Sequence, residues 1–424
     1  MSPVSAFACA LGAAIVLLFP PNALAESTGA LSLTRALQRA LAANPRLTAA
    51  ERDIGIAAGR RIQSGAIPNP ELSFELDNVF GTGDYRGTRA AETTLQLSQL
   101  VELGAKRQAR IAAGTAELDS AYWQRAAVRL EVLSETAIAF FNVLSAQRRV
   151  QIFDTQIASL ARLLPLLQRR VDAGASSPAE IARAQVAADL VRAERERALT
   201  ELSIARRELA VLMGTNNPDF RSVLGDLSSV GRPPPFQTLL RAIESNPQLI
   251  RWTAVRAQRD AELLTARLKP VPDVRLAAGW RHFRETNDNA VRLGISIPIP
   301  VWDQNRGAII EAQETLAKTD AERAASKTFL IFTLGRAYDT LTGSLRELDI
   351  LRGSALPNAR RAVEGMESGY SLGRFSLLEL LDVQNTLTQA ALREQEVLIK
   401  FHTSLATIEG LTGNPFALTG ARSR

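Results

Sequence analysis

Two carboxylates near the end of the chain have the spacing of a cation-attracting pair. Glu379 and Asp382 lie three residues apart in the stretch "GRFSLLELLDVQ", which begins at Gly373. On a helix, residues three apart share one face, so both side chains would present their charge to the same space. Carboxylates that gather around a narrow opening attract cations and repel one another. The alternative is that each one simply stabilises a helix N-terminus, where negative charge is favourable.

Residue types suited to catalysis or metal ligation are scarce. The 424-residue sequence has two histidines, His282 and His402, and its one cysteine is Cys9. No HExxH, CxxC, GxGxxG or P-loop pattern occurs. We expect neither histidine to bind a metal and assign no catalytic, cofactor-binding or metal-binding residue. The sequence predicts a protein that is not an enzyme.

The stretch around the carboxylates occurs twice. "GASSPAEIARAQ" at 174–185 shares its glycine, one serine, its glutamate and its glutamine with "GRFSLLELLDVQ" at 373–384, about 200 residues later. Other pairs follow at nearly the same offset: "ALAANPRL" and "AIESNPQL", "PNPELSFEL" and "PVPDVRLAA", "LMG" and "LTG". A repeat this long is half of one architecture rather than a solenoid unit. We therefore expect a tandem duplication, with structural repeats at 26–230 and 231–424.

Residues 1–25 have the features of a secretory signal peptide. The stretch "ALGAAIVLLFPPNALA" combines a short apolar core with small residues before Glu26, where we expect cleavage. Beyond it, no apolar run approaches the roughly 20 residues of a membrane-spanning helix. The formal net charge is +6, but arginine alternates with acidic residues at helical spacing, and no nucleic-acid-binding motif accompanies it. We expect an exported protein that does not bind nucleic acid.

One very long helix is expected in each repeat. From 104 to about 171, and from about 303 to 368, helix-forming residues dominate and apolar residues recur every three or four positions. At 1.5 Å per residue, each helix would be roughly 100 Å long. Each contains one late proline, Pro165 or Pro357, at which we expect a kink.

The repeated Gly-x-x-Ser stretch predicts the turn of a helical hairpin. Glycine takes the left-handed conformation that often follows a helix C-terminus, and serine caps the N-terminus of the next helix. These positions are Gly174 and Ser177 in the first repeat, and Gly373 and Ser376 in the second. Each long helix is therefore expected to end in a tight tip, from which a second helix returns.

Extended segments precede each long helix, at about 70–101 and about 272–300. Apolar and polar residues alternate in "ELSFELDNV", "TLQLS", "VRLAAGWRHF" and "VRLGISIPI". Such alternation is typical of transmembrane β-hairpins, although a soluble sheet with one buried face gives the same pattern. Four strands leave open edges, which cannot face lipid. Closure therefore requires other subunits, and three copies would give twelve strands.

With these motifs in this order, the chain resembles the TolC-like trimeric outer-membrane efflux channels. The resemblance rests on the duplicated order of elements, on "ALxxNPxL" and "PNPEL", on the two tips and on the terminal "LTG". Within that family, "VELGAKR" and "IPVWDQNRG" look like the heavy-metal, CzcC-like branch. The implied fold is mainly α with a small transmembrane β part. Its duplicated protomer would form a trimeric twelve-stranded β-barrel, continued by a long periplasmic α-helical barrel.

The resemblance implies the outer-membrane channel of a tripartite efflux system in a Gram-negative bacterium, a passive conduit for heavy-metal cations. Its partners would be a homotrimer's other two chains, outer-membrane lipid, an inner-membrane resistance–nodulation–division pump and a periplasmic membrane-fusion adaptor. The adaptor would dock on the tips at Gly174, Ser177, Gly373 and Ser376. Drug efflux and polypeptide secretion are alternatives within transport, and a soluble long-helical scaffold is the alternative from another class.

The resemblance also assigns a gate at the tunnel mouth. Tyr370 stands where the family has a latch tyrosine, and Arg374 lies one residue before the position of a latch arginine. Glu379 and Asp382 match an acidic pair that lines the mouth. Three-fold symmetry would place six carboxylates there. The first tip, where Glu180 is followed by an arginine three residues later, is not expected to add to this constriction.

Overall fold

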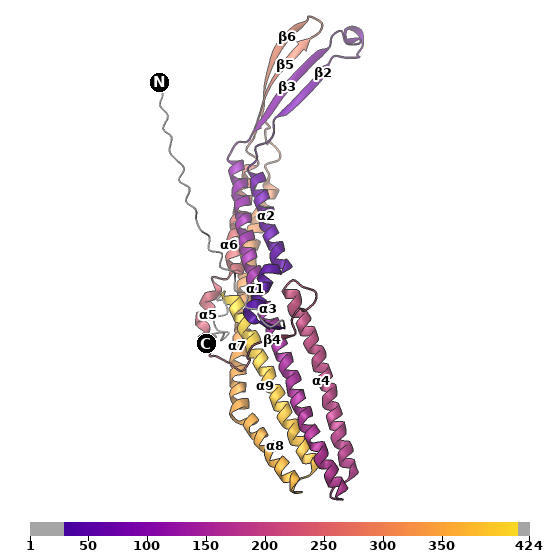
Figure 1. Ribbon diagram of the computed structural model, residues 1–424. Coiled ribbons are helices and arrows are strands. Elements are labelled where there is room, and N and C mark those ends of the chain that lie inside the picture. The colour runs from indigo at the N-terminus through magenta and orange to yellow at the C-terminus, as the bar shows by residue number, and fades with distance from the viewer. Residues whose placement is uncertain (1–28, 414–424) are drawn as a thin grey trace, which may run out of the picture.

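The computed structural model describes residues 29–413, and the expected signal peptide at 1–25 lies outside the described residues. The helices are α1 (Leu33–Ala43), α2 (Pro45–Ser64), α3 (Lys106–Asp172), α4 (Pro178–Leu212), α5 (Phe236–Ile243), α6 (Pro247–Leu268), α7 (Arg306–Ile350), α8 (Leu356–Ser371) and α9 (Leu377–Thr412). The strands are β1 (Ala30–Ser32), β2 (Glu71–Asp77), β3 (Glu92–Val101), β4 (Ser222–Leu224), β5 (Val274–Phe283) and β6 (Asp288–Ser296). The molecule is elongated, with β2, β3, β5 and β6 at one end and the helical tips at the other (Figure 1).

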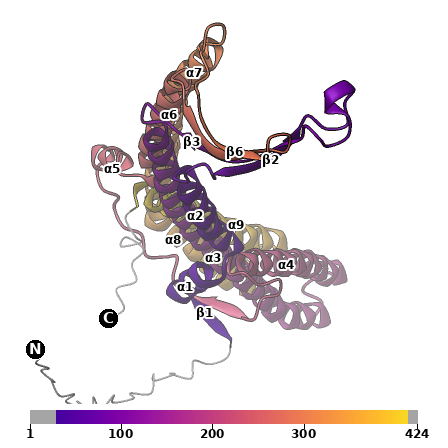
Figure 2. The same ribbon diagram turned by 90° about the horizontal axis from the view of Figure 1, so that it is seen from above.

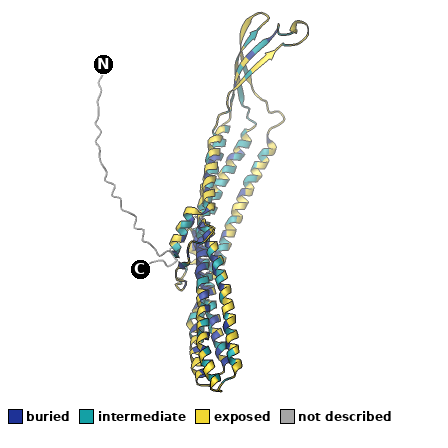
Figure 3. Ribbon diagram, turned by 45° about the vertical axis from the view of Figure 1, so that its right-hand side comes forward, coloured by how far each residue is buried: buried dark blue, intermediate teal, exposed yellow. Residues whose placement is uncertain are grey.

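The four long strands form one antiparallel sheet in the order β2-β3-β5-β6, which curves as an arc when seen from above (Figure 2). Apolar side chains align across it: Phe74 pairs with Leu95, Leu95 with Trp280, and Trp280 with Val291. All four are exposed, and little of this sheet is buried (Figure 3). The described chain therefore leaves the apolar face uncovered, although Thr94 and Ser98 on the polar face are buried. This argues against a soluble sheet whose apolar face is buried. None of the described helices is long and apolar enough to cross a membrane.

The first long helix agrees with its prediction. α3 runs for 67 residues, or about 100 Å at 1.5 Å per residue. Pro165 lies inside it, and the helix continues past this proline to Asp172. A proline removes one hydrogen-bond donor and crowds the preceding turn, but here it does not end the helix.

The second long helix bends where its proline predicts a kink. The helical path runs from Arg306 to Ser371, and a π-helical turn at Leu351–Ala355 joins α7 to α8. Pro357 follows directly, and the chain bends at this point (Figure 1). Proline cannot supply the helical hydrogen bond, and a wider π turn accommodates the loss. Arg352 within the turn donates to Glu394 of α9 across 2.6 Å.

The duplication is visible in a repeated asparagine contact. Asn44 and Asn246 each cap a helix by accepting a hydrogen bond from the backbone N–H two residues later, at 2.9 and 2.8 Å. Each side-chain amide also donates to a carbonyl at the end of its repeat's returning helix, Leu212 or Leu411, at 2.8 Å. Both asparagines are buried. The "NP" motif thus closes each repeat by joining its first helices to its last.

Both histidines have structural contacts. His402 is buried in the main core, where its ring lies 4.9 Å from that of Phe141 and its Nε2 lies 2.9 Å from the carbonyl of Leu227. Burial lowers the pKa of His402, although the bond to Leu227 opposes this effect. His282 stacks on Trp280 in β5 with 5.8 Å between ring centres.

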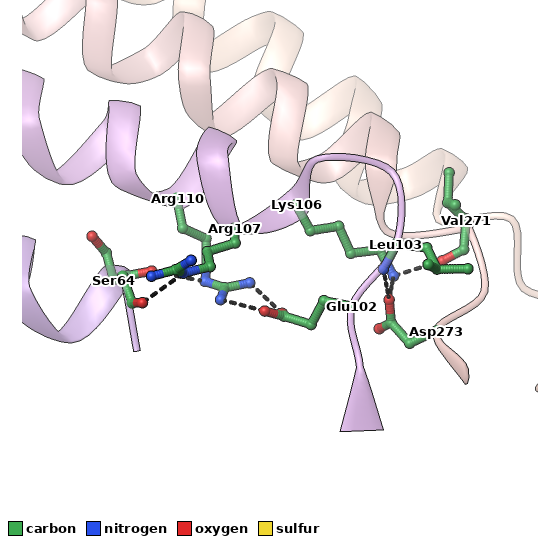
Figure 4. A network of polar contacts seen from close by, with 9 residues as sticks. Ser64, Glu102, Leu103, Lys106, Arg107, Arg110, Val271 and Asp273 are labelled. Carbon is green, nitrogen blue, oxygen red and sulfur yellow. Dashed lines mark hydrogen bonds and ion pairs between the residues drawn. The ribbon is translucent and has the colours of Figure 1, made fainter. Parts of the chain in front are cut away.

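The motif "VELGAKR" forms the junction between strand and helix (Figure 4). Glu102 accepts two hydrogen bonds from Arg110, at 2.5 and 2.8 Å. Lys106 reaches into the second repeat, where its ammonium donates to Asp273 across 2.8 Å, and the N–H of Leu103 donates to the same oxygen across 3.0 Å. The motif therefore fastens the start of α3 to the segment that leads into β5.

A tight backbone turn brings these groups together. Gly104 has a φ of +72° and Ala105 a φ of +62°. A side chain at Gly104 would meet Val271, since a Cβ there would lie 3.0 Å from the nearest valine methyl. Glycine is thus required both by the left-handed conformation and by the close packing.

The junction predicts a loss of stability in acid. Partial burial opposes charge on Asp273, but Lys106 and the Leu103 N–H outweigh it and lower the pKa of the carboxyl. Arg110 likewise lowers the pKa of Glu102. A carboxyl with a depressed pKa stabilises the fold above its unfolded pKa of about 4, and the contribution disappears as pH falls through the folded value.

Asp273→Asn should therefore cost about 1–2 kcal/mol at pH 7, and the difference from the wild type should shrink below about pH 4. Thermal unfolding of the purified protein at several pH values measures this. Asp84→Asn, in an exposed loop, is the matched control and should change nothing. An Asp273→Asn difference that stays constant down to pH 3 would contradict the assignment.

Candidate functional site at the helical tips

Both hairpin tips lie at the end of the molecule farthest from the long strands (Figure 1). In each tip the glycine N–H donates to the carbonyl three residues back, and the next N–H donates to the carbonyl five residues back, at 2.8–3.0 Å. Gly174 has a φ of +70° and Gly373 a φ of +73°. This is the Schellman arrangement, in which a left-handed residue satisfies the last carbonyls of a helix.

The tip serines begin the returning helices. Ser177 accepts a hydrogen bond from the N–H of Ala179 at 3.3 Å, and Ser376 accepts one from the N–H of Glu379 at 3.3 Å. In the second tip the contact is reciprocal, because Glu379 Oε2 accepts from both the N–H and the hydroxyl of Ser376, each at 2.8 Å. Glu379 and Ser376 therefore form a capping box.

Tyr370 is only 1% exposed, and it joins the two tips. The guanidinium of Arg170, at the end of α3, lies over the tyrosine ring, 4.8 Å from its centre. The same guanidinium donates to the Tyr370 carbonyl across 2.7 Å and to the Ser176 hydroxyl across 3.1 Å. The Tyr370 hydroxyl donates to Glu180 of α4 across 3.3 Å. One side chain of the second hairpin is thus held by both helices of the first.

A small apolar core lies beside this contact. Its buried members, besides Tyr370, are Leu163 and Leu167 of α3, Ala184 of α4, and Leu377 and Leu380 of α9. The core thus joins all four helices at the tips. Packing and the Arg170 contact together fix the position of the second hairpin relative to the first.

The Tyr370 phenol and the Glu379 carboxyl have pKa values shifted in opposite directions. Burial, followed by the charge of Glu180, raises the pKa of Tyr370, which keeps the phenol protonated as a donor. The N–H of Ser376 lowers the pKa of Glu379, so this carboxylate is ionised at neutral pH. Asp382 and Arg374 are exposed, and neither side chain makes an ion pair or hydrogen bond to another described residue.

The structure brings some of the predicted site residues together and keeps others apart. Tyr370 contacts the first tip, whereas Glu379 caps its own helix. Arg170 was missed because nothing in "LQRRVDAG" distinguishes it from its neighbours. In the sequence Glu180 is only the counterpart of Glu379, and no motif indicates that its side chain pairs with Tyr370.

A family model described as "outer membrane efflux protein" matches residues 36–215 and 239–414. The chain belongs to this efflux family. The cobalt-zinc-cadmium resistance protein CzcC of Cupriavidus metallidurans is 31% identical over 402 residues, which cover 95% of this chain and 94% of CzcC. Outer membrane protein TolC of Escherichia coli is 23% identical, with 85% of this chain and 77% of TolC covered. The predicted resemblance to TolC-like channels and their CzcC-like branch is confirmed.

The fold agrees with this membership. The Campylobacter jejuni CmeC outer membrane channel has a TM-score of 0.77 at 15% identity, with 90% of this chain and 85% of that one covered. The predicted fold class is confirmed: an efflux-family protomer is duplicated and mainly helical, and its four strands form one third of a trimeric twelve-stranded β-barrel. The protein is an outer-membrane efflux channel.

Proposed function

We propose that this channel is the outer-membrane component of a tripartite system that exports heavy-metal cations. The observation that carries the proposal is the similarity to CzcC, a cobalt-zinc-cadmium resistance protein, over 95% of the chain. CnrC of the same organism, a nickel and cobalt resistance protein, is 26% identical over 75% of the chain and supports the same cargo class. The channel itself is passive. The inner-membrane resistance–nodulation–division pump supplies the energy, and a periplasmic adaptor connects pump and channel.

Deletion of the gene in its Gram-negative host tests the cargo. The mutant should accumulate more cobalt, zinc or cadmium than the parent, and the intact gene should restore efflux. Unchanged metal accumulation together with raised sensitivity to drugs would replace this proposal with drug efflux. Recovery of the protein outside the outer-membrane fraction would overturn the localisation, which is the outer membrane with the helices in the periplasm.

At the tunnel mouth, we assign Tyr370 and Arg374, with the acidic pair Glu379 and Asp382, to the gate. Two observations support this assignment. The contact between Tyr370 and Arg170 couples the two hairpins of one protomer. Glu379 and Asp382 add two unneutralised charges per chain at the same end of the molecule, since neither carboxylate makes an ion pair with a described residue. Three chains would bring six such charges to one opening.

The adaptor is assigned to the tips, at Gly174, Ser177, Gly373 and Ser376. The position and the backbone conformation of these four residues support the assignment. Both turns lie at the far end of the helices. Gly174 has open space around it, and a Cβ at Gly373 would lie 4.0 Å from the guanidinium of Arg170. The second tip additionally exposes three apolar side chains, Leu372, Phe375 and Leu378.

Gly373→Val should reduce efflux while leaving the trimer intact. A β-branched residue at a φ of +73° costs roughly 1–2 kcal/mol, so the turn should rearrange locally. Adaptor crosslinking at the tip and metal efflux should both fall several-fold. Gly365→Val is the matched control, because Gly365 lies within α8 with open space around it. Normal efflux by a verified Gly373→Val trimer would count against docking at this turn.

A further inference from the structure

The face of the long sheet opposite its apolar side chains carries charged residues. Glu75 pairs with Thr94 across the strands, and Thr94 pairs with Arg281. Arg292 of β6 also forms an ion pair with Glu75 of β2, with 3.8 Å between the charged atoms. β2 and β6 are the two edges of the sheet, so their side chains can meet only across a concave surface. The charged face is therefore the inside of the arc (Figure 2), which lines the lumen when three sheets close one barrel.

Three arginines lie on this lumen wall, and each has a carboxylate partner on another strand. Arg281 of β5 donates from Nη1 to Glu92 of β3 across 2.8 Å, and from Nε to the Thr94 hydroxyl across 2.9 Å. Thr94 is only 1% exposed. Arg275 of β5 forms an ion pair with Glu71 of β2. The third pair is the one that joins the two edge strands. Each arginine thus links strands and has its charge neutralised by a neighbour.

Carboxylates outnumber arginines on the lumen wall. Asp77 pairs with Glu92 across the strands, and Asp288 pairs with Phe283, so both aspartates lie on the charged face at the outer end of the sheet. Within the four long strands this face carries five carboxylates and three guanidinium groups. The difference is two negative charges per chain. Three chains would give the barrel six.

A barrel of this size is narrow enough for wall charges to act on a passing ion. Twelve strands about 4.8 Å apart and tilted by about 40° enclose a radius of about 12 Å, measured to the backbone. The Debye length is about 10 Å at 0.1 M salt and about 30 Å at 0.01 M. Charges on the wall therefore reach ions throughout the lumen. Nine arginines without partners, three from each chain, would repel cations from this segment.

We propose that the cross-strand ion pairs make the barrel wall a second determinant of ion selectivity, separate from the mouth at the helical tips. Glu71, Glu75 and Glu92 neutralise the lumen arginines, and the wall as a whole then favours cations. The arginines can join the strands without opposing the cargo. The inference deepens the proposed export of cations and rests on it.

Reversal potentials in a planar bilayer under a salt gradient near 0.01 M test the proposal. Glu92→Gln leaves three arginines unpaired in each trimer, so the permeability ratio of cations to anions should fall roughly fivefold. Arg281→Gln leaves three carboxylates unpaired and should raise the ratio by a similar factor. The double variant Glu92→Gln/Arg281→Gln restores the net charge and should return the ratio to that of the wild type. At 1 M salt, where charges act over about 3 Å, the differences should disappear.

Two further variants separate selectivity from a purely structural role. Arg281→Lys keeps the charge but loses the planar guanidinium, and Thr94→Val removes one hydrogen-bond partner of Arg281 without changing any charge. Both should keep the wild-type ratio. If the pairs only held the strands together, the two single Gln variants would change the ratio in the same direction and the double variant would not restore it. Glu71→Gln and Arg275→Gln repeat the test at the second pair if a variant of the first does not form trimers.

The outcomes distinguish this inference from the proposed cargo. Single variants that keep the wild-type ratio at 0.01 M overturn the inference alone, because metal accumulation in the deletion strain tests the cargo without them. Opposite shifts in the two single variants support the wall as a determinant of selectivity. If those shifts occur in a channel whose wild type prefers anions, the proposed cation cargo is overturned instead.

Discussion

An Arg170→Leu channel should conduct more current than the wild type in a planar bilayer at the same voltage. Arg170 joins the two hairpins of a protomer through a charged group, with a 2.7 Å bond to the Tyr370 carbonyl and its guanidinium over the Tyr370 ring. A hydrogen bond from a charged group contributes about 1.5–3 kcal/mol, and an exposed cation–π contact about 0.5–1 kcal/mol. A loss of about 2 kcal/mol shifts the equilibrium toward separated hairpins roughly thirtyfold.

The geometry also ranks two related variants. Tyr370→Phe removes only the 3.3 Å bond to Glu180 and keeps the ring under Arg170, so its conductance should rise much less. Arg169→Leu makes the same change one residue earlier, where the side chain bonds only within its own helix, and should conduct like the wild type. If Arg170→Leu conducts no better than Arg169→Leu, the Arg170 contact does not hold the mouth narrow.

The double variant Glu379→Gln/Asp382→Asn should lower the cation selectivity of the channel and its block by multivalent cations. Six carboxylates per trimer are removed, two from each of three chains. Glutamine is accepted at the third position of a capping box, so the start of α9 should be preserved. The effect should be several-fold at 0.01 M salt, where screening acts over about 30 Å, and nearly absent at 1 M, where it acts over about 3 Å.

Reversal potentials under a salt gradient measure the selectivity. Glu180→Gln is the matched control, because it removes a carboxylate from the first tip and keeps an oxygen that can accept from Tyr370. It should change neither selectivity nor block. Wild-type selectivity of the double variant at 0.01 M would mean that Glu379 serves its helix alone and that the constriction lies elsewhere.

The repeated features were the most predictable part of the fold. Motifs that recur in two copies, such as the tips and the "NP" turns, could be compared with one another. The residue types within each motif then indicated its structural role, as a helix end or a helix cap. Glycine with a positive φ and serine as a cap depend on neighbours within a few residues. The alternation of the strands was also predictable, because apolar side chains dominate one face of this sheet, where Phe74, Leu95, Trp280 and Val291 are paired.

What escaped prediction depends on residues far apart in the chain. The bond between Arg170 and Tyr370 spans 200 positions, and neither residue has a spacing that reveals the other. The motif "VELGAKR" suggested a branch of the family, but its contacts with Asp273 and Val271 of the second repeat required coordinates. The sequence predicts a kink at both Pro165 and Pro357, but it does not show that a π turn precedes only the second of them.

That difference gives the two copies different shapes. α3 is one continuous helix from the sheet to its tip, whereas the equivalent path in the second copy bends at the π turn Leu351–Ala355. Beyond this turn α8 runs for 16 residues, about 24 Å, toward the tip. A difference of about 10° in the bend would displace the far end of α8 by about 4 Å. Two copies of one ancestral part thus differ in the angle that sets where Tyr370 meets the first tip.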